Sequence, residues 1–142
     1  MKLHIVTIGR PKLAYAQVGF NEYVKRLERL QDVRVSHIAD RHNDTDHILK
    51  VTEGSHRVAM VIDGPQFTSE GLAHFLKKRE LEAKEVSFII GGPEGLPQQV
   101  IDSAETKMGL SKLTFPHDLA MVVLAETLYR SSSINNSHPY HK

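Results

Sequence analysis

A glycine-rich turn interrupts the stretch SFIIGGPEGLPQQV at residues 87–100. Gly91 and Gly92 can adopt a positive φ and allow a ligand to approach the main chain closely. Pro93 stiffens the loop, and Gly95 permits a second bend. Backbone N–H groups would then recognise the ligand. The glycine spacing excludes a phosphate loop and a dinucleotide-binding fingerprint, which leaves another ligand-binding turn or an ordinary strand-to-helix turn.

Two further loops have the same character. In LSKLTFPHDLAMVVLAETLYR, residues 110–130, a short β-rich run breaks at Pro116 and His117 follows. The stretch VIDGP at 61–65 also ends a β-rich run. Ligands of open α/β sheets bind beyond the carboxyl ends of the strands. We therefore expect all three loops to line one crevice.

The elements that must position these loops alternate along the chain. Periodicity and turn signals predict strands over 2–9, 33–39, 57–63, 86–90 and 112–115. Helices are expected around 20–30, over 43–54, after an N-cap at Thr68, over 97–108 and over 119–130. This alternation predicts an α/β fold, a mostly parallel sheet flanked by helices, within a single domain covering residues 1–142.

The last of these helices has no polar face over two turns. Such a helix must be buried on most sides, either at the centre of the core or in a subunit interface, and the sequence leaves both open. Glu126 follows the apolar run and needs a partner if it is buried, for which Arg130, one turn later, is the candidate. A polar tail, SSSINNSHPYHK, is expected after Arg130.

Composition excludes several classes of protein. The 142 residues include 18 basic and 17 acidic side chains and no cysteine, so disulfides and thiolate zinc sites are excluded and any RNA contact must be local. No apolar run is long enough to span a membrane, and we expect a cytoplasmic protein. His42 and His47 lie in a polar loop whose spacing matches no strong ligand pattern, so no metal site is expected.

Four ordered motifs, IIGGPEGL, LSKLTFPH, VVLAETLYR and HPYHK, resemble those of the RlmH family of SPOUT-class methyltransferases. The resemblance spans the whole chain. It implies a deep trefoil knot in the C-terminal third, with the knot and the cofactor site within about residues 86–142. It also implies S-adenosyl-L-methionine as cofactor, a homodimer, and methylation of N3 of a pseudouridine in 23S rRNA of the assembled ribosome. The implied cofactor-binding residues are Met60, Gly91, Gly92, Gly95, Ser111, Lys112, Leu113, Thr114, Phe115 and Pro116.

The implied reaction is the attack of a ring nitrogen on a sulfonium methyl group. It needs in-line alignment and loss of the nitrogen's proton, so positioning should supply most of the catalysis. A histidine, a tyrosine or water could take the proton. In the family the tail closes over the active site, and the candidate catalytic residues are therefore Arg130, His138, Tyr140 and His141.

The chain departs from the family pattern in its last helix. Met121 stands where members carry arginine, Asp118 where proline or an amide is usual, and Ser131 and Ser132 where an aromatic residue is usual. The missing charge leaves two alternatives open: a catalytically silent, knotted protein that binds the ribosome or RNA, and a SPOUT methyltransferase with a different RNA substrate. A phosphoacceptor receiver domain would share the alternation and an acid such as Asp63, but the first strand ends in TIGR, without the acids that hold magnesium.

Overall fold

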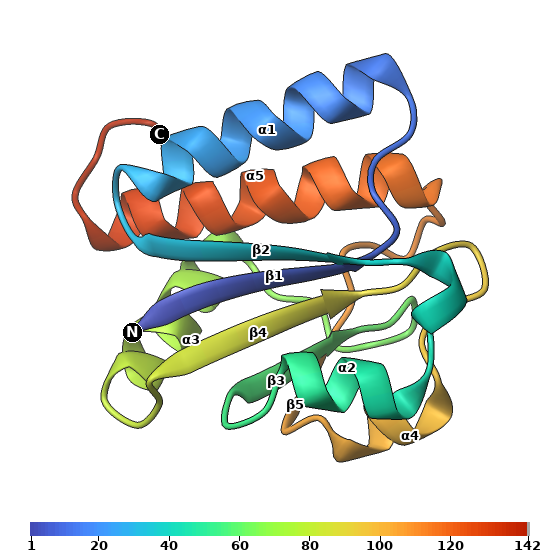
Figure 1. The fold of residues 1–142 in the computed structure, drawn as a ribbon. Helices are drawn as coiled ribbons and strands as arrows, with labels where there is room; N and C mark the ends of the chain where they lie inside the picture. The colour runs from blue at the N-terminus through green and yellow to red at the C-terminus, as the bar shows by residue number, and fades with distance from the viewer. Residues whose placement is uncertain (142) are drawn as a thin grey trace.

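The computed structural model describes residues 1–141 and contains a five-stranded sheet (Figure 1). The strands are β1 (Lys2–Ile8), β2 (Asp32–Ile38), β3 (His56–Met60), β4 (Glu85–Ile90) and β5 (Thr106–Met108). Their order across the sheet is β2-β1-β4-β3-β5, and every neighbouring pair is parallel. The α/β fold with a parallel sheet is therefore confirmed.

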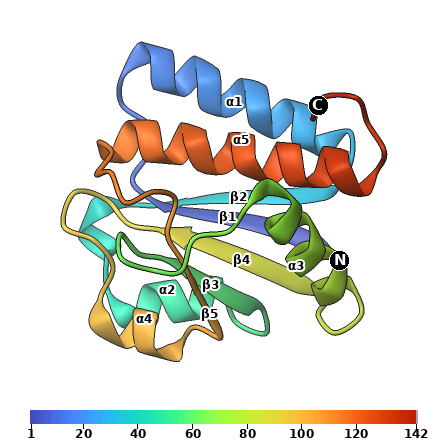
Figure 2. The ribbon, with the colours of Figure 1, turned by 180° about the vertical axis from the view of Figure 1, so that it is seen from behind.

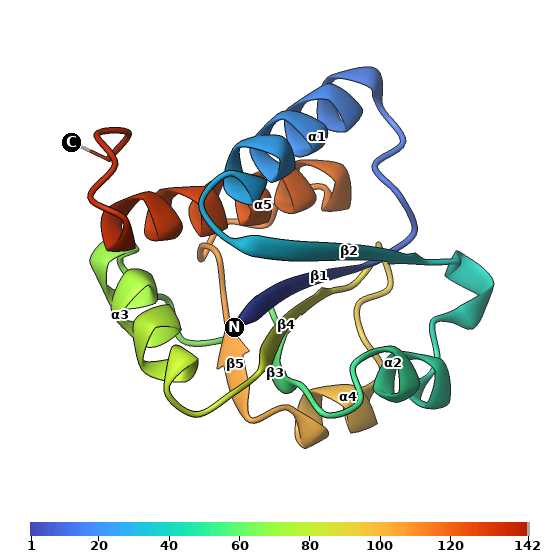
Figure 3. The same cartoon turned by 60° about the vertical axis from the view of Figure 1, so that its left-hand side comes forward.

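Helices cover both faces of this sheet (Figure 3). On one face lie α1 (Ala14–Glu28), α3 (Ser69–Glu80) and α5 (His117–Asn135), and α5 contacts both of the others. The other face carries the shorter α2 (Thr45–Val51) and α4 (Gln98–Ser103), which contact each other. The predicted cap of α3 is confirmed, because the Thr68 hydroxyl accepts a hydrogen bond from the N–H of Gly71 at 2.9 Å.

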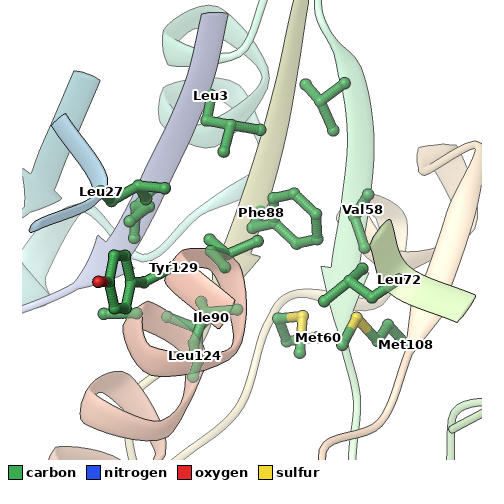
Figure 4. Close-up of a cluster of buried hydrophobic side chains, with 14 of the residues drawn as sticks. Leu3, Leu27, Val58, Met60, Leu72, Phe88, Ile90, Met108, Leu124 and Tyr129 are labelled. Carbon is green, nitrogen blue, oxygen red and sulfur yellow. The ribbon is translucent and has the colours of Figure 1, made fainter. Parts of the chain in front are cut away.

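Alternation along the central strands divides the core between the two faces. In β1, Leu3 and Ile5 belong to the larger cluster, whereas Val6 and Ile8 belong to a smaller one, as the period of two in a strand requires. Figure 4 shows Phe88 of β4 in the larger cluster together with Leu124 of α5. Burying side chains of this size contributes about 1.5–3 kcal/mol each, so the large cluster fixes α5 against the sheet.

The last helix is buried as predicted, but it is longer than the predicted range of 119–130. Met121, Leu124 and Leu128 are fully buried. The three serines 131–133 are buried inside the helix and are not part of a polar tail. The hydroxyl of Ser133 bonds back to the carbonyl of Arg130 at 2.6 Å. Those of Ser131 and Ser132 are buried without a hydrogen-bond partner among residues 1–141. Met121 therefore stands in the core.

Two element predictions near the C-terminus were wrong. Residues 112–115 form a largely exposed loop, and the fifth strand is β5, six residues earlier. The predicted helix over 97–108 ends at Ser103, because Ala104 takes extended backbone angles. The next residues form the edge strand β5, which pairs with β3, and the N–H of Val61 bonds to the carbonyl of Met108 at 2.9 Å. For residues 106–108, hydrogen bonding to β3 at the edge of the sheet therefore prevails over the helical periodicity of the sequence.

The segment that follows β5 crosses the loop that follows β3 (Figure 2). A Cβ on Gly64 would lie 2.8 Å from the carbonyl carbon of Met108, and a Cβ on Gly109 would lie 2.7 Å from the carbonyl oxygen of Gly64. The N–H of Gly109 bonds to the carbonyl of Pro65 at 2.9 Å. Backbone thus packs directly on backbone at this crossing. The trefoil knot that the resemblance implies stays a prediction.

Candidate functional site

A pocket of about 220 Å³ opens beyond the carboxyl ends of β3, β4 and β5. Its lining comes from the loops that follow these three strands and from the first turn of α5. The predicted convergence of three loops on one crevice is therefore confirmed. The parallel sheet explains it, because all strands end at the same edge.

Most residues predicted to bind a cofactor line this pocket. Of the ten, all but Lys112 and Pro116 do so. Lys112 is exposed on its loop, and Pro116 is the N-cap residue of α5. Met60, at the end of β3, was predicted, but Ile90 and Met108, which end β4 and β5, were not. The predicted end of β4 was a signal for Ile90. His117 and Ala120, on the first turn of α5, were not assigned to the cofactor site either. The residues without a predicted role there are Val61, Ile62, Ile90, Pro93, Met108, Leu110, His117 and Ala120.

The glycine turn has a shape that only glycine permits. Gly95 has a φ of 77°, and its N–H bonds to the carbonyl of Gly92 at 3.0 Å. A Cβ on Gly91 would lie 2.7 Å from the carbonyl carbon of Gly95. From the other side, the amide of Asn43 donates to the carbonyl of Gly95 at 3.1 Å. The turn is therefore held before any ligand arrives.

The pocket is mostly apolar at its mouth and contains one ionisable group. Ile62 and Leu113 line it and are 66% and 73% exposed, so an apolar ligand group would cover them. Within residues 1–141, His117 is the only ionisable side chain that lines the pocket. Recognition must therefore depend on shape and on backbone polar groups.

The predicted catalytic residues gather in a second cluster around the C-terminal tail. The guanidinium of Arg130 donates to Glu126 at 2.8 Å, which confirms the predicted pair. The hydroxyl of Tyr140 donates to the same carboxylate at 2.9 Å. Nδ1 of His141 lies 3.2 Å from Arg130, and its Nε2 lies 3.0 Å from Glu70. Burial, followed by the bonds to neighbouring side chains, raises the pKa of Tyr140 above its usual value.

This cluster does not lie over the pocket of the same chain. His117 and Arg130 are 13 positions apart on α5, or roughly 20 Å at the helical rise per residue. Figure 1 shows the tail at the opposite end of α5 from the loop that follows β4. His138 lies in the tail and is exposed. The family resemblance implied that the tail closes over the active site. Within one chain the tail does not reach the pocket.

The polar loop at His42 and His47 forms a local structure. Asp44 caps α2 by accepting the N–H of His47 at 2.9 Å, and its carboxylate also contacts Nδ1 of the same ring. The two imidazoles stack with ring centres 4.1 Å apart. His42, Asp44 and His47 are near enough to one another to hold an ion, but the hydrogen bonds of Asp44 to His47 already account for this arrangement.

The comparison with known proteins decides the family. The profile described as "Predicted SPOUT methyltransferase" matches residues 1–141. The chain belongs to the SPOUT methyltransferase family. It is 41% identical to "Ribosomal RNA large subunit methyltransferase H" of Deinococcus radiodurans, over 100% of this chain and 99% of that protein. It is 35% identical to a protein of the same name from Thermus thermophilus, over 100% and 99% of the two chains.

Solved structures show the same SPOUT fold. A probable methylase family protein from Haemophilus influenzae superposes with a TM-score of 0.61 at 9% identity, covering 99% of this chain and 70% of that one. A probable methyltransferase from Bordetella pertussis gives 0.60 at 12% identity, covering 92% and 93%. Members of the SPOUT family use S-adenosyl-L-methionine as methyl donor. Among residues 1–141 no helix combines the length and apolar character needed to cross a membrane.

Proposed function

We propose that this SPOUT protein transfers a methyl group from S-adenosyl-L-methionine to N3 of a pseudouridine in 23S rRNA of the assembled ribosome. The observation that carries the proposal is the full-length match to relatives named as large-subunit rRNA methyltransferases, together with a built pocket at the matching motifs. With a ribosomal target, the enzyme would act in the cytoplasm.

The pocket fits the cofactor in its chemistry. Leu113, Ile62 and Phe115 offer apolar surface for the adenosine, and the backbone at Gly95 is open to close approach, because a Cβ there would meet no atom within 4 Å. Bound there, the cofactor supplies an activated methyl group on sulfur. The chain's own part is to hold the donor and the target nitrogen in line, to exclude water and to provide a place for the proton.

A homodimer would bring the tail to the pocket. The tail cluster lies at the wrong end of α5 to reach the pocket of its own chain, so it can serve catalysis only at the pocket of a second copy. The first half of α1 begins at the pocket edge of the sheet and carries exposed apolar side chains, Tyr15 at 54% and Val18 at 70%. They are three positions apart and share one helix face. We take this face, with Leu13, as part of the dimer interface.

The weak net charge favours recognition of the assembled ribosome over free RNA. A net charge of +1 gives little general attraction to RNA phosphates. A small protein of this kind needs a shaped target that both subunits of a dimer can contact. We therefore expect methylation of intact ribosomes and much less methylation of protein-free 23S rRNA.

Transfer of labelled methyl to ribosomes from cells lacking this protein tests the proposal. Label mapped to N3 of a large-subunit pseudouridine is the expected result. Cofactor binding without any transfer to ribosomal or other RNA would favour the catalytically silent alternative. Label on another RNA would establish a SPOUT methyltransferase with a different substrate. Absence of cofactor binding, measured by calorimetry, would overturn the proposal.

A further inference from the structure

We propose that His117 accepts the proton that N3 loses, and that the buried carboxylate of Asp118 holds its imidazole in the tautomer this requires. The inference rests on the proposed function, because it assigns a role within that reaction. It moves the proton acceptor from the tail to the pocket wall.

The position of His117 is the first observation. It is the first residue of α5, lines the pocket, and has a side chain that is 26% exposed. The target base must enter this same pocket to meet the methyl group. Among residues 1–141, no other side chain that lines the pocket is ionisable. The nearby loop residues Glu94 and Lys112 do not line it.

The unused oxygen of Asp118 is the second observation. Asp118 is 3% exposed, and its Oδ2 accepts the backbone N–H groups of Lys12 at 2.8 Å and Leu13 at 2.7 Å. Its Oδ1 is buried without a hydrogen bond from any residue of 1–141. Nε2 of His117 lies 3.2 Å from this oxygen, outside hydrogen-bond geometry. A small ring rotation would satisfy both groups, since a buried carboxylate oxygen needs a donor.

This contact fixes the roles of the two ring nitrogens. When Nε2–H donates to Asp118, Nδ1 carries the lone pair and can accept a proton. Nδ1 makes no hydrogen bond within residues 1–141, so it is available to substrate. The carboxylate in turn stabilises the imidazolium that forms, as the orienting acid of a catalytic triad does.

The tail residues are poor alternatives in the conformation observed. The raised pKa of Tyr140 keeps its phenol protonated, and its hydroxyl donates to Glu126. A guanidinium can only donate, so Nδ1 of His141 accepts from Arg130 and its Nε2–H faces Glu70. Nδ1 of His138 accepts the N–H of Tyr140 at 3.2 Å. Each acceptor lone pair is already used.

The step balances as a displacement with proton transfer. N3 gains the methyl group, and its N–H bond breaks. The proton passes to Nδ1 of His117, and the electron pair of the broken carbon–sulfur bond stays with the sulfur. The imidazolium then returns its proton to solvent once the methylated base has left.

Kinetics on intact ribosomes test the acceptor, with wild-type transfer as the reference for the proposed function itself. We expect His117→Ala to lower kcat by roughly 10²–10⁴-fold while cofactor binding, measured by calorimetry, changes little. Added imidazole should restore part of the rate by filling the space left by the ring. His74→Gln, at an exposed histidine on α3, serves as the matched control. A His117→Ala enzyme with wild-type kcat, or one that imidazole does not rescue, would overturn the assignment.

The tautomer provides a readout that does not depend on activity. Nitrogen chemical shifts of His117 in the labelled protein should show the Nε2–H form in the wild type and a mixture in Asp118→Asn. Asn can still accept the N–H groups of Lys12 and Leu13, so the variant should fold, which circular dichroism checks. In the same variant kcat should fall by roughly tenfold or more with KM little changed.

The two measurements separate this inference from the proposed function. If the wild type methylates no RNA, the proposed function fails, and the tautomer still decides whether the pair exists. If the wild type methylates ribosomes but the Nδ1–H form dominates, or if Asp118→Asn leaves both tautomer and kcat unchanged, only the role of Asp118 and His117 is overturned.

Discussion

Single residues in this molecule either preserve a backbone shape or hold a charge in a particular state. Gly95 and Gly54 have the same φ of 77°, and a Cβ on either would meet no atom within 4 Å. One lies in the pocket turn and the other in the α2–β3 loop. The pair therefore separates the effect of backbone strain from the effect on the ligand site.

Gly95→Ala should weaken cofactor binding, whereas Gly54→Ala should not. Both variants should lose about 1–2 kcal/mol of unfolding free energy, because a side chain disfavours the left-handed conformation. In Gly95→Ala the backbone should shift to relieve that strain, and this shift would move the turn that forms the pocket. In Gly54→Ala the same shift would occur away from the pocket. Calorimetric titration with the cofactor and urea unfolding of both variants check this. Equal cofactor affinity in the two variants would show that the turn does not contact the ligand.

His4 illustrates a charge state fixed by burial. It is fully buried on β1 and lies 2.7 Å from the Ser36 hydroxyl. Burial first, then the charge of Arg34, lowers its pKa to about 4. The unfolded chain binds the proton near pH 6.5 while the folded protein does not. Stability must therefore fall as the pH drops from about 6.5 toward 4.

The loss attributable to His4 should approach about 3 kcal/mol at pH 4, from a pKa difference of roughly 2.5 units. Urea unfolding of the wild type and of His4→Gln between pH 4 and 8 measures it. The slope with pH should be shallower in the variant, though not zero, because burial also lowers the pKa of His37 and His56. An unchanged slope would show that His4 is protonated in the folded state.

At the scale of elements, the sequence predicted the helices and strands that have a clear hydrophobic period. It did not predict the shortest strand, β5. Four of the five predicted strands and the buried nature of the last helix follow from periodicity, which reflects burial on a face. β5 has only three residues, too few for a period, and it exists because its backbone pairs with β3. The three serines of α5 were predicted to belong to a polar tail, because their composition does not reveal that they are buried.

The candidate site was predictable to the extent that motifs mark loops. The motifs located the glycine turn and implied that residues 111–115 bind the cofactor, although 112–115 was predicted as a strand. The sheet topology explains why the two segments meet. Asp118 was noted only as a departure from a family pattern. Its contact with the start of α1 spans more than 100 residues of sequence, and no local spacing reports such a contact.

The crossing between the loop after β3 and the segment after β5 should tolerate added side chains poorly. Gly109→Ala places a Cβ 2.7 Å from the carbonyl oxygen of Gly64. Backbone cannot move aside as a side chain can, so we expect a loss of about 1–3 kcal/mol or more of unfolding free energy. Gly92→Ala is the control, since its Cβ would meet Ile8 at an ordinary 3.5 Å. Chemical denaturation measures the free energy of unfolding of both variants. Equal values would contradict direct packing of backbone on backbone at the crossing.

At the scale of the whole molecule, the separation of pocket and tail along α5 leads to a test by subunit mixing. Gly91→Ala should disable the pocket and Tyr140→Ala the tail, leaving each homodimer nearly inactive. If each pocket uses the tail of its partner, a heterodimer of the two variants joins the intact pocket to the intact tail.

Random exchange would then restore about a quarter of wild-type methyl transfer, since half the dimers are mixed and each mixed dimer has one intact site out of two. If the tail serves the pocket of its own chain, mixing would restore no methyl transfer, because every site would still contain one altered part. If the tail serves no pocket, the Tyr140→Ala homodimer would be active before mixing. The rate after refolding the variants together, compared with unmixed samples, distinguishes these arrangements.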